Sequence, residues 1–184
     1  MGYTLELYAT RLDAVRAELA DPRLTPEATG ARPGVDDEVI ARWPELAATV
    51  ARALTGDGGD VTWPHSGYVR FVVRGLGAWY GSLWHTSSGG REFRSGLLAG
   101  SVADLFGEDT ARHLVNRPLD QLAWPDVPML GWLTNAELRP LAATARTSGP
   151  APHTPEQDAD AVWTLIDAVD RAASAGRDLV TVYT

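Results

Sequence analysis

The chain has 184 residues, of which 45% are hydrophobic and 22% are charged, and its formal net charge at pH 7 is −8. This apolar fraction excludes wholesale disorder, and the length suits one globular domain with a sizeable core. The lack of cysteine excludes a disulfide framework and a thiolate zinc site. All 16 basic residues are arginine, which excludes a lysine Schiff base and a Walker-type phosphate loop. Together with frequent Ala, Gly and Pro, this arginine usage indicates a GC-rich bacterial genome.

The acidic balance and the opening of the chain bear on partners and location. A net charge of −8 argues against general nucleic-acid binding and against attraction to anionic membranes. The first residues contain no basic segment followed by an apolar stretch, and no apolar run approaches the roughly 20 residues that span a bilayer. We therefore expect a cytoplasmic protein that binds neither nucleic acid nor membranes.

Helical patterns dominate the first 54 residues after an opening strand. Thr10 is placed to cap a helix whose apolar face runs to Leu19. Residues 21–35 are rich in Pro and Gly and predict a loop. A second helical pattern covers residues 36–54, and Pro44 is expected to divide or kink it.

The middle of the chain is less regular. Residues 57–60, Asp-Gly-Gly-Asp, predict a turn. Residues 66–76 fit both a strand and a helix, and the helix, with Ser66 as its cap, is favoured. Residues 77–100 are rich in Gly, Ser and aromatic side chains and predict an irregular loop with at most a short helical turn.

Two capping boxes mark helix starts in the last third. Helices are expected over about 97–106 and 109–116, and the prolines in 118–131 predict a connector. Thr134 with Glu three residues later, and Thr154 with Pro and Glu following, are capping-box signals. The second one opens the strongest amphipathic helix of the chain.

Strands are expected at both ends. Residues 3–9 and 178–184 alternate between apolar and polar side chains, which is typical of half-buried strands. We expect these strands to pair in one small sheet, giving a helix-rich α+β domain that spans 1–184. The Pro-, Gly- and Ser-rich segment 147–154 is an internal linker, because the helix and strand after it are too small to fold alone.

Segments at both ends, and one before the first capping box, carry a family resemblance. The opening Met1-Gly2-Tyr3, the ending Ala175-Gly176-Arg177-Asp178-Leu179-Val180-Thr181-Val182-Tyr183 and the segment Gly131-Trp132-Leu133-Thr134 resemble the YfbM-like group of uncharacterised bacterial proteins. The resemblance implies an α+β domain of similar length that ends in a long helix and a strand. That group has no established activity, so the resemblance carries no functional residue to this chain.

The segment 61–103 is the most promising place for a binding site. It contains four arginines but only one acidic residue, Glu92, and it holds seven of the 15 aromatic residues. Arginine with aromatic walls suits an anionic ligand that is planar or partly apolar. The alternative is that the aromatic rings fill the core and the arginines pair with distant acids. The candidate ligand-binding residues are Trp79, Trp84, His85, Ser87, Arg91 and Arg94.

Signals for catalysis and metal binding are weak. The four histidines are isolated and lack metal-ligand spacing, so no metal and no cofactor is expected. Three hypotheses remain open. The chain is a non-enzymatic binding or protein-interaction module with a basic partner, or it binds an anionic aromatic small molecule through residues 63–94. The third is a hydrolase-like enzyme with His65 or His85 as general base.

Overall fold

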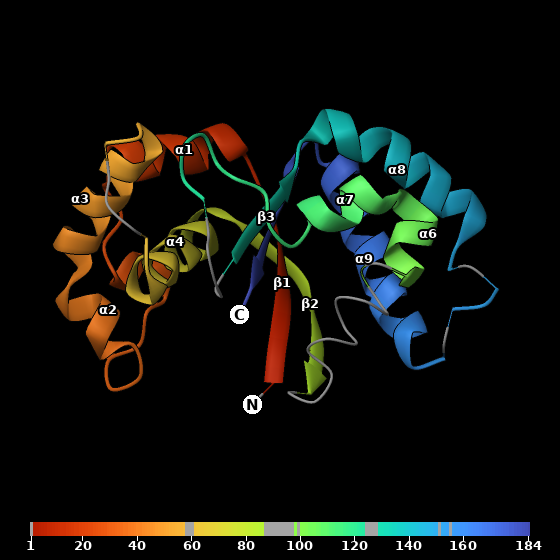
Figure 1. Cartoon of the computed structure of the whole chain (residues 1–184), viewed down its shortest axis with the longest axis horizontal. Helices are drawn as coiled ribbons and strands as arrows, with labels where there is room; N and C mark the ends of the chain where they lie inside the picture. Colours follow the sequence, from red (N-terminus) through yellow and green to blue (C-terminus); the bar gives the residue numbers. More distant parts are fainter. Residues whose placement is uncertain are drawn as a thin grey trace.

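An antiparallel sheet lies between two groups of helices. The structure is a computed structural model that describes residues 2–57, 61–86, 98, 100–123, 129–150, 152–154 and 156–184. The strand order is β2-β1-β4-β3. Figure 1 shows the strands in the middle, with helices α1–α4 on one side and α6–α9 on the other. This arrangement confirms the predicted α+β class.

The central strand pair joins the two ends of the described chain. β1 (Gly2–Thr10) pairs with β4 (Asp178–Tyr183), as the sequence predicted. β2 (Ala78–Thr86) and β3 (Met129–Leu133) flank this pair. Every strand contact in the sheet is antiparallel, so its strands alternate in direction across the whole width.

The two faces of β1 meet different helices. Leu5 and Leu7 are fully buried, and Leu7 is the register partner of Thr181. Thr181 donates a hydrogen bond to the carbonyl oxygen of Leu114, so this face lies against the α6–α9 group. The opposite face of β1 carries Glu6, whose carboxylate pairs with Arg70 of α4. Alternation along β1 therefore sends apolar side chains to one helix group and polar ones to the other.

The first helix group packs around two aromatic rings of α4. The group comprises α1 (Leu12–Ala20), η1 (Glu27–Thr29), α2 (Asp37–Ala41), α3 (Trp43–Leu54) and α4 (Trp63–Leu76). The Trp43 ring meets Tyr68 edge-on, with 4.8 Å between ring centroids, and lies 6.4 Å from Phe71. Its indole nitrogen donates to the Leu24 carbonyl oxygen over 3.1 Å. Trp43 thus ties α3 to α4 and to the loop before α2.

Long helices dominate the second group. It comprises α6 (Ala103–Phe106), α7 (Glu108–His113), α8 (Asn135–Ser148) and α9 (Glu156–Ser174). The predicted capping box at Thr134 is present, with Glu137 accepting from the Thr134 amide over 2.8 Å. α8 continues to Ser148, so the first two residues of the expected linker 147–154 belong to this helix. Residues 152–154 lie between the two long helices.

The helix predicted for residues 66–76 is confirmed, but it begins earlier. Its N-cap is Thr62 rather than Ser66, and His65 occupies the position where a capping box usually has Glu. Pro44 does divide the pattern of residues 36–54, because α3 starts at Trp43 with Pro44 in its first turn. The expected Thr10 cap of α1 is wrong: the N-cap is Arg11, and the Leu12 amide donates to a distant carboxylate, Asp178.

Two strands contradict the sequence prediction. The segment 77–100 is not wholly irregular, because Ala78–Thr86 forms β2. Its alternation is broken by a register shift opposite Leu7 and Tyr8, and Gly81 there has a φ of 139°. The connector expected over 118–131 is shorter than predicted, because β3 begins at Met129. All five residues of β3 are buried, so this strand shows no polar alternation.

Some predictions fall outside the described residues. The turn at 57–60 is described only at Asp57, and most of the segment 87–99 is likewise not described. In the residues that are described, no helix is both long and apolar enough to cross a bilayer.

Candidate functional site

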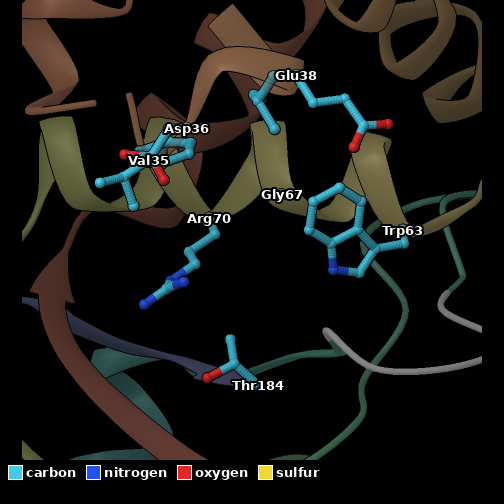
Figure 2. A pocket seen from close by; sticks show the side chains of 9 residues that line it. Val35, Asp36, Glu38, Trp63, Gly67, Arg70 and Thr184 are labelled. Carbon is cyan, nitrogen blue, oxygen red and sulfur yellow. The ribbon is translucent and has the colours of Figure 1, made fainter. Parts of the chain in front are cut away.

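A cavity opens between α2, α4 and the end of the central sheet (Figure 2). We call it the α2–α4 pocket. Its volume of about 380 Å³ is in the range of small-ligand sites. Two helices, the two residues before α2 and the residue after β4 supply its walls, which combine apolar side chains with both signs of charge. The lining residues are Val35, Asp36, Glu38, Val39, Trp63, Gly67, Arg70, Phe71 and Thr184.

One face of α4 forms a long wall of the pocket. Trp63, Gly67, Arg70 and Phe71 follow the spacing of a single helix face. Gly67 lets α2 approach, since a Cβ atom there would lie 3.3 Å from Cγ2 of Val39. The cap at Thr62 sets the start of α4 and so places Trp63 in its first turn. Helical periodicity in the sequence was therefore a usable signal for this wall.

The deep part of the wall is packed and the mouth is exposed. Val39 and Phe71 are only 4% and 5% exposed, because they also belong to the hydrophobic core. Val35 and Trp63 are 68% and 54% exposed. The pocket therefore has a firm apolar base and an apolar, solvent-facing rim.

Arg70 forms the floor of the pocket and is held there by an ion pair with Glu6. Nε and Nη2 of Arg70 donate to the two carboxylate oxygens of Glu6 over 3.1 and 2.7 Å. The hydroxyl of Tyr8 donates to the same carboxylate over 3.1 Å. Burial of Tyr8, and then the negative charge of Glu6, raise the pKa of the Tyr8 hydroxyl far above its usual value. Burial alone would lower the pKa of Arg70, but the hydrogen bond and charge of Glu6 raise it. The raised pKa values keep Arg70 charged and the Tyr8 hydroxyl neutral around neutral pH.

The rim carries two acidic side chains. Asp36 accepts a hydrogen bond from the Arg32 amide over 2.8 Å. Glu38 lies 3.8 Å from a guanidinium nitrogen of Arg42, which holds Glu45 more closely, at 2.8 Å. Because Glu6 already neutralises Arg70, the lining charges leave an excess of negative charge at the mouth.

Of the six predicted site residues, the structure describes the side chain of Trp79, which does not line this pocket. Trp79 lies in β2, is 61% exposed and is absent from the pocket lining. Trp84 and His85 also belong to β2, although their side chains lie outside what is described. Three further candidates are outside the described residues: Ser87, Arg91 and Arg94. The anionic-ligand hypothesis built on them stays a prediction.

The described histidines have structural surroundings. Nδ1 of His65 accepts a hydrogen bond from the Thr62 amide over 3.1 Å. Burial, and then the charge of Arg42, lower the pKa of His65. The His153 ring lies 2.8 Å from the Asp104 carboxylate at an exposed site. Among the described side chains, no three His, Asp or Glu residues are grouped to hold a metal ion.

No protein-family model, curated protein or solved structure significantly matches the chain.

Proposed function

We propose that the protein is a non-enzymatic binding module and that its ligand site is the α2–α4 pocket. The observation that carries this proposal is the apolar rim, where Val35 and Trp63 stay exposed beside a cavity. Exposed apolar side chains around a concave site are typical of ligand-binding surfaces. The packed base beneath them supports a pocket that exists before the ligand arrives, which lowers the cost of binding.

The contacts of Glu6 at the floor of the pocket favour ligand binding over catalysis. Glu6, the ion-pair partner of Arg70, already accepts hydrogen bonds from Tyr8 and from two nitrogens of Arg70. Both of its carboxylate oxygens are engaged by these donors, so they are poorly available to a bound ligand. Glu6, Tyr8 and Arg70 therefore hold one another in place as a rigid polar floor.

The test uses a neutral aromatic probe, 2-phenylethanol, and NMR signals of the indole N–H groups. We expect a saturable shift at millimolar probe that Trp63→Ala abolishes. Trp79→Ala is the matched control, because Trp79 is similarly exposed but lies outside the pocket. The proposal fails if no saturable response appears, or if Trp79→Ala removes it and Trp63→Ala does not.

A second candidate is a protein-interaction module that binds a basic partner surface. The acidic rim residues Asp36 and Glu38 favour it, as does the net charge of −8. Charge reversal at both positions would then weaken association measured with a purified basic partner. We also propose a cytoplasmic location and kinship with the YfbM-like group, and neither proposal assigns an activity.

A further inference from the structure

We propose that the α2–α4 pocket selects an organic cation, an ammonium or guanidinium group carried on a small apolar body. The inference rests on the proposed function, since it names the ligand chemistry of the same pocket. Three observations support it: the neutralised arginine at the floor, the two carboxylates at the rim, and the exposed indole on the side of Glu38.

The positive charge of Arg70 at the floor is paired with the carboxylate of Glu6. Arg70 gives Nε and Nη2 to Glu6, whose side chain is only 15% exposed. An anionic ligand would have to compete with this bidentate pair and give up its own hydration. It would also enter between Asp36 and Glu38, where like charges repel it. The arginine of the pocket therefore already has a carboxylate partner, which an anionic ligand would have to displace or share.

The rim offers a carboxylate next to an aromatic face. Figure 2 shows the carboxylate of Glu38 directed toward the side of the pocket that Trp63 occupies. Arg42 holds Glu38 only at 3.8 Å and is engaged by Glu45, so Glu38 can accept a second cation. A cation over an indole ring gains electrostatic attraction to the ring as well. Glu38 and Trp63 together therefore favour an ammonium or guanidinium group at the mouth.

The apolar base defines the rest of the ligand. Val39 and Phe71 present hydrocarbon surface below the rim, where Gly67 lets α2 pack closely on α4. A cavity of about 380 Å³ accommodates a ring or short alkyl body rather than a folded segment of a partner. We accordingly infer a small molecule with its apolar body inside and its charge at the rim.

The experiment compares three probes of nearly equal size: 2-phenylethylammonium, 2-phenylethanol and phenylacetate. Dissociation constants are taken from the indole signal of Trp63, assigned through its loss in Trp63→Ala. We expect the cation to bind about tenfold more tightly than the alcohol, and phenylacetate to bind most weakly. Glu38→Gln should lower the affinity for the cation about fivefold and leave the alcohol unchanged. Glu108→Gln is the matched control, because it removes the same charge at an exposed position on α7.

The outcomes separate this inference from the proposed function. Equal affinity for all three probes, or tighter binding of phenylacetate, overturns the cation inference but keeps the pocket as a ligand site. No response of Trp63 to any probe overturns the proposed function itself. A fourth probe, N-acetyl-lysine methylamide, represents a protein side chain. If it binds more tightly than 2-phenylethylammonium, the occupant is a basic protein partner and the small-molecule inference is wrong.

Discussion

Thr181 of β4 donates a 2.5 Å hydrogen bond to the carbonyl oxygen of Leu114, which lies 67 residues earlier in the chain. Both groups are fully buried. The register partner of Thr181 is Gly131, where a Cβ atom would lie 2.5 Å from the same carbonyl. The end of α7 therefore rests directly on the sheet, at the one place in β3 that has no side chain.

Removing the Thr181 hydroxyl should destabilise the fold. Thr181→Val keeps the shape but leaves the Leu114 carbonyl without this donor, which costs about 1–3 kcal/mol. Urea unfolding followed by circular dichroism measures the loss. Thr144→Val is the control, because its hydroxyl bonds within an exposed turn of α8, and it should change stability by less than about 0.5 kcal/mol. Equal effects at the two positions would refute the buried role of Thr181.

Asp178 should stabilise two helices at once. Its Oδ2 accepts from the Leu12 amide of α1 and its Oδ1 accepts from the Asn135 amide of α8, each over 2.7 Å. Asp178→Asn keeps one acceptor and should cost about 0.5–2 kcal/mol, the usual value of one helix cap. Asp178→Ala removes both and should cost about twice as much. Asp160→Asn, an exposed acid on α9, is the charge control. A loss in Asp178→Ala no larger than in Asp178→Asn would contradict the double cap.

The stability of the fold should depend on pH through His65. The neutral ring accepts the Thr62 amide, and burial lowers the pKa of His65 below its ordinary value of 6.5. The unfolded chain therefore takes up a proton first as the pH falls. The contribution of His65 to the free energy of unfolding is complete above pH 6.5. It declines as the pH falls toward the lower pKa that His65 has in the folded protein.

His65→Gln provides the test of that pH dependence, because Gln at this position of a capping box can accept the same amide without titrating. Unfolding free energies measured between pH 7.5 and 5 should fall less steeply in this variant. A smaller slope should remain, since burial also lowers the pKa of His113. Identical slopes in the two proteins would show that His65 does not contribute.

Glu137 should contribute stability that is lost in acid. Its burial acts to raise its pKa, but hydrogen bonds from Arg117 and Thr134 outweigh this and lower the pKa to about 2. The contribution is present above the ordinary value of 4.5 and declines as the pH falls from there toward 2. The difference in unfolding free energy between the wild-type protein and Glu137→Gln should therefore shrink from pH 5 to pH 3. A constant difference over this range would contradict the assignment.

Local signals in the sequence predicted most elements but not the whole sheet. The strands at both ends alternate, and the capping box at Thr134 has a local signature, so both were predictable. β2 was not, because the glycine at position 81 and the register shift interrupt its alternation. β3 was not, because burial of all its residues removes the polar positions that would mark a strand.

The candidate site depends on contacts that no local pattern contains. Arg70 and Phe71 could be assigned to one face of a helix, together with Trp63, from their spacing alone. The partner of Arg70, however, is Glu6, 64 residues earlier, and the opposite wall comes from α2. The segment 61–103, chosen for its aromatic and arginine content, contains α4, but the six candidate residues named from it all lie after that helix. The charge of its surroundings is set by tertiary contacts.

The position of β4 in the chain has a consequence for the order of synthesis. β1 needs β4 as its neighbour, and Leu12, just after β1, needs Asp178, which is 166 residues away. The ribosome therefore produces α1–α4, β2 and β3 before the strand that fills the middle of the sheet exists. Until then, Leu5 and Leu7 have no completed core to enter, and the nascent chain displays an unpaired apolar edge. Closure of the sheet therefore has to wait until β4 has been synthesised.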